Sequence, residues 1–273
     1  MTALRDADVG TLLRGWRERR RLSQLDLASR AEVSTRHLSF VETGKSIPTR
    51  EMIDRLATHL DVPLRERNHL LLSAGFAPQH PERTLDAPEL LAVSAALGRI
   101  LDAHLPNPAL VLDRWWDIVD RNSATDFLLE GCSGHLLDPP VNAVRLSLHP
   151  EGLAPRIRNL GQWRAHLIGQ VSARAQRTGD ARLRSLADEV TAYPGEATGT
   201  PGAGDVVIPL ILSMQPGDLS FFSISAAVES ALDVTVDELR IEAFYPADEA
   251  TARHLEQGGT PTTEGRRARA DPL

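Results

Sequence analysis

Residues 22–49 read LSQLDLASRAEVSTRHLSFVETGKSIPT, and their spacing predicts two short helices joined by a tight turn. Ser23 precedes the first helix and Ser34 precedes the second. Serine is a favoured N-cap because its side-chain oxygen accepts a hydrogen bond from a backbone N–H that the helix leaves unpaired. Gly44 and Pro48 then end the second helix. The stretch therefore predicts one helix–turn–helix unit.

The two faces of this unit differ in polarity. The apolar side chains are expected to pack between the helices, and they are Leu25, Ala28, Val33, Leu38 and Val41. The opposite face of the second helix presents Thr35, Arg36, Ser39, Phe40 and Thr43. A short helix that is supported from behind and polar on its outer face is suited to entering the major groove of DNA.

The pattern L-S-Q-x-x-L-A, V-S and L-S-x-x-E-x-G-x-x-x-P stands at residues 22–28, 33–34 and 38–48. It resembles the helix-turn-helix of the Cro/C1-type (Xre) repressor family. The resemblance implies a five-helix, all-α, lambda-repressor-like domain that binds palindromic double-stranded DNA as a homodimer. One position departs from the family: Glu32 stands where such turns usually carry glycine. A non-glycine residue in a left-handed turn costs about 1 kcal/mol, which is tolerable.

Roles in DNA binding follow from position in this unit. We expect Gln24 to bond a phosphate at the start of its helix, and Arg36 to bond O6 and N7 of guanine. Phe40 is expected to contact a thymine methyl group or, equally, a core or dimer neighbour, whereas His37 is expected on the helix surface. The full set of expected DNA-binding residues is Gln24, Ser34, Thr35, Arg36, Ser39, Phe40, Thr43, Lys45 and Ser46.

The resemblance also implies an ion pair between Arg17 and Glu42, which would lock the second helix onto the preceding helix at residues 8–20. The alternative is that Arg17 joins Arg19, Arg20 and Arg21 in a solvated or phosphate-facing cluster.

Composition and charge separate the chain into two parts. The net charge is −7, but residues 1–72 contain 13 Lys and Arg against 10 Asp and Glu, a net of +3, so the remainder carries −10. Binding to DNA phosphates requires positive charge, which residues 1–72 carry. The acidic remainder of the chain is expected to have a different function. The single cysteine, Cys132, excludes an intramolecular disulfide and fits a reducing cytosol, and the chain has no long apolar run. A cytoplasmic location is expected.

The pattern of residues predicts a domain at 1–76, a linker at 77–88, a second domain at 89–256 and a disordered tail at 257–273. In the first domain, further helices are expected at 50–60 and 63–75. In the second, helices are expected at 89–101, 122–128, 141–148, 160–177 and 181–191. Strands are expected at 109–112, 116–121, 205–214, 219–225 and 239–245, with a flexible loop at 195–204 and a hairpin turn at 215–218. This α+β plan, an antiparallel sheet of about five strands with helices on one face, resembles the PAS architecture.

The whole layout resembles Xre-type regulators that carry an MmyB-like ligand-binding domain. The stretches that carry this resemblance are PLRERNHLLLSAGFAP (63–78), ALVLDRWWDIVDRN (109–122), NAVRLSLHPEGLAPRI (142–157) and LDVTVDELRIEAFYPAD (232–248). It departs at residues 226–230, where more threonine and glycine would be expected. The resemblance implies a small hydrophobic, fatty-acid-like effector and no other cofactor.

Candidate ligand-binding residues in the second domain are Trp116, Asn142, Arg145, His149, Trp163 and Phe222. Three of them, Asn142, Arg145 and His149, share one helix face, so they are placed to hold a carboxylate or another polar head. A salt bridge from Arg145 to an acid elsewhere is an equal alternative. For the apolar residues the alternative is an ordinary core.

Signals of catalysis and of metal binding are weak. Self-cleaving repressors need a Ser–Lys pair in the C-terminal half, but the only lysine is Lys45. Cys132 and His135 form a single C-x-x-H without a second pair, so no metal site is expected. We therefore expect no enzyme, but a dimeric DNA-binding transcriptional regulator with an effector domain. The alternative is that the second domain recruits a partner protein.

Overall fold

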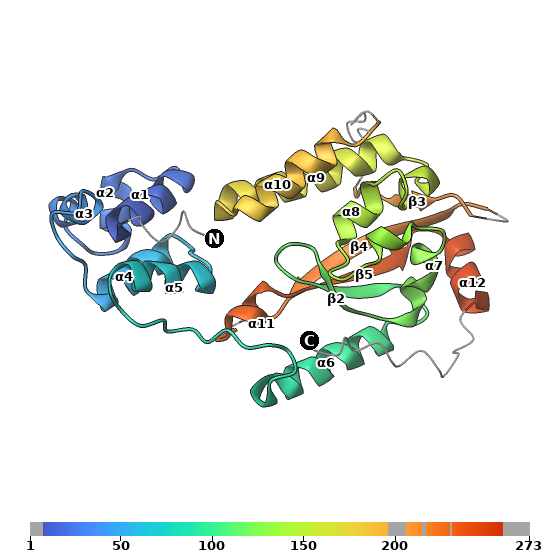
Figure 1. The fold of residues 1–273 in the computed structure, drawn as a ribbon, viewed down its shortest axis with the longest axis horizontal. Coiled ribbons are helices and arrows are strands. Elements are labelled where there is room, and N and C mark those ends of the chain that lie inside the picture. The colour runs from blue at the N-terminus through green and yellow to red at the C-terminus, as the bar shows by residue number, and fades with distance from the viewer. Residues whose placement is uncertain (1–7, 196–205, 215–216, 230, 259–273) are drawn as a thin grey trace. The chain divides into compact units, whose positions relative to one another are not determined.

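The computed structural model describes residues 8–195, 206–214, 217–229 and 231–258. These residues form two compact units (Figure 1). Of the described residues, the first unit contains 8–84 with the short segments 176–179, 228–229 and 231–237, and the second contains the others. Most of the loop expected at 195–204, part of the turn expected at 215–218 and the tail from residue 259 lie outside the described residues.

The first unit begins with five α-helices within its described residues up to 84. They are α1 (Val9–Arg19), α2 (Gln24–Arg30), α3 (Thr35–Glu42), α4 (Arg50–His59) and α5 (Leu64–Ser73). Serine and threonine caps begin three of them: the side chains of Ser23, Ser34 and Thr49 each accept a hydrogen bond from a backbone N–H in the first turn. These caps explain why short helices begin where they do.

The turn between α2 and α3 is left-handed at Glu32, with φ of 53°. Val33 N donates to Ala28 O at 3.0 Å and closes this turn. The helix–turn–helix therefore forms without the usual glycine. One expectation for this unit is wrong: Leu25 is 66% exposed and does not belong to the core, because it lies on the outer side of α2 while Leu27 and Ala28 face inward.

Backbone contact between α1 and α3 is close at Gly10. A Cβ atom added at Gly10 would lie 2.1 Å from the carbonyl oxygen of Val41. Real Cβ atoms do not approach a backbone oxygen to this distance, so only glycine allows α3 to pack against α1 here. Val41 itself is fully buried in the core of the unit, with Leu13, Trp16 and Leu38.

A buried ion pair joins the same two helices. Arg17 Nε donates to Glu42 Oε1 at 2.7 Å, and Arg17 Nη2 donates to Glu42 Oε2 at 2.9 Å. Arg17 Nη1 donates to Leu22 O at 2.8 Å, and Gln24 Nε2 donates to Glu42 Oε2 at 2.7 Å. The Glu42 hydrogen bond raises the pKa of the Arg17 guanidinium above its usual value, so Arg17 stays charged. The pair expected between Arg17 and Glu42 is thus present, and it holds α1, α2 and α3 together.

The second unit is built on a five-stranded antiparallel sheet with the order β2-β1-β5-β4-β3. The strands are β1 (Ala109–Leu112), β2 (Ile118–Arg121), β3 (Leu210–Leu212), β4 (Leu219–Ala227) and β5 (Arg240–Pro246). Together with the helices around it, the sheet makes this unit the expected α+β, PAS-like domain. Strand β3 is shorter than expected because Pro209 precedes it and cannot donate a ladder hydrogen bond.

Helices cover both faces of this sheet, not one as expected (Figure 1). On one face, α6 (Leu91–Ala103) packs through Leu97 and Leu101 against Ala109 and Val111 of β1. The other face presents Leu110 and Leu112 of β1. It packs against α8 (Ala143–Leu148), α9 (Leu160–Thr178) and α10 (Ala181–Ala192). Strand β1 is buried on both sides because its side chains alternate between the two cores.

Several short elements were not anticipated from the sequence. They are η1 (Pro88–Leu90), η3 (Gly134–Leu136), η4 (Ala154–Arg156), α11 (Val234–Glu238) and α12 (Glu249–Gly258). The helix expected at 122–128 is present as η2 (Ser123–Thr125) followed directly by α7 (Asp126–Leu129). Helix α12 includes residues 257 and 258, which were expected in the tail. No helix among the described residues combines the length and the apolar character needed to cross a membrane.

Replacing Gly10 by alanine is expected to destabilise the first unit by at least about 2 kcal/mol, because the new methyl group would collide with the Val41 carbonyl oxygen. Gly15 in the same helix is a matched control: a Cβ there would meet only Arg19 Nη1, at 3.7 Å. Gly15→Ala should be neutral or stabilising by up to about 1 kcal/mol. Urea unfolding of both variants measures the difference, and equal stabilities would contradict the close packing of α1 on α3.

Removing the Glu42 carboxylate by Glu42→Ala should cost about 3–5 kcal/mol, because it leaves the Arg17 charge buried without a partner. Glu18→Ala breaks an exposed pair with Arg14 and should cost less than about 1 kcal/mol. The double variant Arg17→Met, Glu42→Leu should recover most of the loss. Thermal and urea unfolding compare the three proteins, and an equal cost for Glu42→Ala and Glu18→Ala would show that the buried pair does not organise the unit.

Candidate nucleic-acid interface and ligand pocket

The outer face of α3 carries an aromatic ring, Phe40, with two cations near it. Phe40 is 37% exposed, Arg36 Cζ lies 5.4 Å from the centre of its ring, and Lys45 Nζ lies 5.9 Å from it. Arg36 and Lys45 are both exposed. The ring therefore does not belong to the core of this unit, and it sits beside two positive charges that can meet a phosphate or a base edge.

The neighbouring expected DNA contacts have partners within the protein. The Ser34 side chain accepts from His37 N at 3.1 Å and caps α3, and the Thr43 hydroxyl donates to Ser39 O at 2.7 Å. Gln24, which is partly buried, donates its side-chain amide to Glu42. In this arrangement Gln24 supports α3 from behind, so a phosphate contact by its side chain would require that hydrogen bond to break. Thr35, Ser39 and Ser46 are partly buried at the edge of the face.

The second unit contains a largely apolar pocket between the sheet and helices α8 and α9, with a volume of about 90 Å³ and partly open to solvent. A water molecule needs about 10–15 Å³ of such space, so the pocket has room for several water-sized groups. Its apolar walls are formed by Leu110, Leu112, Trp116, Ile118, Leu128, Leu129, Ala143, Val144, Leu146, Leu153, Trp163, Leu167, Leu210 and Phe244.

Polar groups also line this pocket. His166 and Gln170, one turn apart on α9, hydrogen-bond to each other at 2.9 Å. Ser223 and Glu242 line it from the adjacent strands β4 and β5. Burial lowers the pKa of His166, although the Glu242 carboxylate opposes the shift, so His166 is neutral near pH 7 and offers one donor and one acceptor. The pocket thus combines an apolar body with hydrogen-bonding groups from both the sheet and α9.

Two of the six expected ligand-binding residues line the pocket. Trp163 presents its ring to it and donates Nε1–H to Ser147 Oγ at 2.9 Å. Trp116 lines it from the β1–β2 connection, where its φ of 64° is unusual for a bulky residue. The Arg174 guanidinium lies 4.5 Å from the Trp116 ring centre.

The polar trio on α8 is not part of the pocket lining. Arg145 donates to both Glu189 oxygens, at 2.6 and 2.8 Å, which is the alternative salt bridge. Asn142 is buried as the N-cap of α8 and donates to Trp115 O and Asp117 Oδ1. Arg145 thus contacts α10 and Asn142 contacts the β1–β2 connection, while His149 is the C-cap after the last residue of α8. The α8 residues that line the pocket are Ala143, Val144, Leu146 and Ser147.

The remaining two expected residues lie elsewhere. Phe222 stacks on Tyr245 with ring centres 5.4 Å apart, on the face of the sheet opposite to Phe221 and Ser223. Successive side chains of a strand point to opposite faces of the sheet. The expectation that Phe222 lines the pocket was therefore wrong by one position along β4, since its neighbour Ser223 lines the pocket. His149 follows α8 and lies beside Tyr193 and His135, with ring centres 5.0 and 5.4 Å apart.

The polar lining residues on α9 were missed, although the sequence contains a signal for them. Trp163, His166, Leu167 and Gln170 follow the i, i+3, i+4, i+7 spacing of one helix face. A polar pair within an apolar helical stripe is the feature that would have indicated them. Glu242 and Ser223 required the strand register, which the sequence does not supply.

Cys132 is a poor candidate for a nucleophile. Its thiol donates to Leu128 O at 3.6 Å, and burial raises its pKa above the usual value. The thiolate is the reactive form of cysteine, so this shift lowers its reactivity.

Comparisons with known proteins agree with both units. Residues 93–257 match the family described as MmyB-like transcription regulator ligand binding domain, and residues 8–70 match a helix-turn-helix domain. Uncharacterized HTH-type transcriptional regulators from Mycobacterium bovis and from two strains of Mycobacterium tuberculosis are 32% identical to this chain over 130 residues. These alignments cover 48% of this chain and 44% of each relative, so the chain spans less than half the length of the curated relatives it matches.

Among solved structures, that of an RNA-binding Light-Oxygen-Voltage receptor is similar over 94% of this chain and 62% of that chain, with 13% identity. Its TM-score is 0.24, too low to support any argument about this protein. The family matches together cover most of the described residues of both units. The chain belongs to the MmyB-like transcription regulators, with a helix-turn-helix domain followed by the ligand-binding domain.

Proposed function

We propose that this transcription regulator is a homodimer that binds a palindromic DNA operator and responds to a small hydrophobic effector in its ligand-binding domain. The observation that carries the proposal is the pocket of the second unit: its walls are apolar, and His166, Gln170, Ser223 and Glu242 add hydrogen-bonding groups. A fatty-acid-like molecule, with an apolar body and a polar end, has the matching chemistry.

DNA reading is assigned to the outer face of α3. Arg36 is exposed and can bond a guanine with two parallel hydrogen bonds, which is worth about 1–3 kcal/mol of discrimination. Phe40 lies close enough to Arg36 and Lys45 to contact the same stretch of groove. The buried Arg17–Glu42 pair supports this assignment because it fixes α3 to the rest of its unit.

Dimer formation follows from the limited reach of one reading helix. A single small domain contacts too few bases for tight specific binding, whereas a two-fold dimer reads two half-sites about one helical turn, or roughly 34 Å, apart. The effector would act by favouring one spacing of the two α3 helices over another. It can change DNA affinity only by as much as its preference for one of these arrangements.

The alternative, in which the second domain recruits a partner protein, is less well supported. A partner site would be a large exposed apolar patch, whereas the apolar residues around the pocket are mostly buried.

Arg36→Ala should remove sequence preference while weak binding to any DNA remains, because base contacts specify and phosphate contacts do not. The operator is first selected with the intact protein from random DNA, and competition binding then compares it with a scrambled duplex. Arg30→Ala, an exposed residue of α2, loses the same charge and should keep the preference. Unchanged selectivity of Arg36→Ala, or an equal loss in both variants, would remove the base-reading role.

Ala143→Phe should fill the pocket and weaken effector retention about five- to 150-fold, because overpacking costs about 1–3 kcal/mol and 1.4 kcal/mol is a factor of ten. Native mass spectrometry of the purified protein detects the retained molecule. Ala95→Phe, on the exposed surface of α6, adds the same side chain away from the pocket and should retain the molecule fully. Equal occupancy in both variants would show that the bound molecule lies elsewhere.

A further inference from the structure

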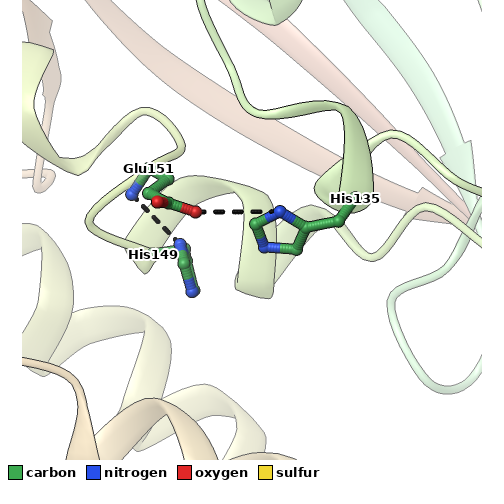
Figure 2. Close-up of side chains that lie close together, drawn as sticks. All are labelled: His135, His149 and Glu151. Atoms are coloured by element: carbon green, nitrogen blue, oxygen red, sulfur yellow. Dashed lines mark hydrogen bonds and ion pairs between the residues drawn. The ribbon is translucent and has the colours of Figure 1, made fainter.

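Two histidines and a glutamate converge outside the ligand pocket. Figure 2 shows the Glu151 carboxylate facing the His135 ring, and one nitrogen of His149 facing the backbone nitrogen of Glu151. One ligand atom from each lies within 4.8 Å of the others. His135 Nδ1 is 3.7 Å from Glu151 Oε2, and the two imidazole rings stand edge to face with centres 5.4 Å apart.

The turn that carries two of these residues is held in place by its backbone. Gly152 N donates to His149 O at 2.9 Å, and Leu153 N donates to Leu146 O at 2.9 Å. A Cβ atom at Gly152 would lie 2.2 Å from Leu146 O, so the turn is packed tightly onto the end of α8. His149 and Glu151 are therefore presented from a fixed backbone and not from a loose loop.

The third residue is tied to the same turn. Ser133 N donates to Glu151 O at 2.9 Å, and Leu136, next to His135, is buried against the Gly152 position. These contacts bring η3, which carries His135, to the turn without involving any of the three side chains. The side chains themselves keep freedom to rotate, since His135 is 54% and Glu151 is 63% exposed.

The protonation of His149 suits a metal ligand. Glu151 N donates to His149 Nδ1 at 3.0 Å, so this nitrogen is an acceptor whose lone pair faces the Glu151 amide, and a metal ion would replace that N–H donor. His135 Nδ1 lies 2.9 Å from the Ser133 hydroxyl, which can donate to it and hold the same tautomer. When a metal takes the His149 lone pair, the exposed Glu151 N–H can bond water instead.

We infer that His135, His149 and Glu151 form a binding site for a divalent transition-metal ion of the zinc class. Two imidazole nitrogens and one carboxylate oxygen are a recognised zinc ligand set, with ligands about 2.0–2.2 Å from the ion and a water in the fourth position. The present separations are longer than in a formed site, and rotation of the exposed His135 and Glu151 side chains closes them. Nitrogen ligands favour zinc or a similar ion over magnesium and calcium, which prefer oxygen.

A metal ion bound here would connect η3 to the turn after α8, and both segments border the ligand pocket. Leu128 and Leu129 precede η3, and Leu146, Ser147 and Leu153 flank the turn, and all five line the pocket. The ion would therefore stiffen one wall of the pocket without entering it. This inference stands on the cluster alone and does not depend on the identity of the effector.

Equilibrium dialysis of the full chain with zinc chloride tests the site. The unmodified protein should bind one equivalent that magnesium and calcium do not displace. His135→Asn and Glu151→Gln should each weaken this binding at least about tenfold, since even loss of an outer-shell partner of a metal ligand costs about that much. Both side chains are exposed, so both variants should keep the unfolding temperature of the metal-free protein. Cobalt substitution adds an absorption spectrum that reports tetrahedral coordination.

His59→Asn is the matched control, because His59 is exposed on α4 and belongs to no such cluster among the described residues. It should bind zinc as the unmodified protein does, and zinc should raise the unfolding temperature of both. Equal zinc affinity in all four proteins would mean scattered surface binding and would overturn the site. Loss of binding in His59→Asn but not in His135→Asn would overturn it as well.

Discussion

The Glu42 carboxylate is the point on which the DNA-reading unit depends. It lies buried at the end of α3 and accepts hydrogen bonds from Arg17 on α1 and from Gln24 on α2. A buried charge is costly unless it is fully paired, so this carboxylate allows only an arrangement in which all three helices meet. Gly10 reinforces the arrangement by allowing the backbone of α3 to approach α1. The outer face of α3 is therefore a rigid surface, as reading a groove requires.

The ligand-binding domain depends on a different constraint, the alternation of side chains along its strands. Ala109 and Val111 face α6, while Leu110 and Leu112 face the pocket and α9. The same alternation places Glu242 and Ser223 on the pocket side and Phe222 on the opposite side. The apolar core and the ligand pocket thus lie on the same face of the sheet. Trp116, in the β1–β2 connection, lines the pocket with a φ of 64°.

Prediction from sequence was most successful where structure is local. Caps at Ser23 and Ser34, the helix–turn–helix between them and the antiparallel pairs β1–β2 and β3–β4 all follow from neighbours in the chain. It was least successful for side chains whose partners are distant in sequence. Arg145 was a candidate for holding an effector, yet its charge is paired with Glu189 on α10. Leu25 was placed in the core because a short apolar pattern does not reveal which side of a helix its neighbours cover.

By itself the sequence determined the kind of protein: a basic helix-turn-helix unit joined to an acidic α+β domain, because caps, turns, periodicity and charge are properties of nearby residues. Only the tertiary structure decided which polar groups are free to act. Arg145 and Asn142 form hydrogen bonds within the protein, whereas His166 and Gln170 line the pocket. The fold also brings His135 close to His149 and Glu151. The physical reason is that a side chain's partners are chosen by packing between segments that are far apart along the chain, and a local pattern cannot specify that choice.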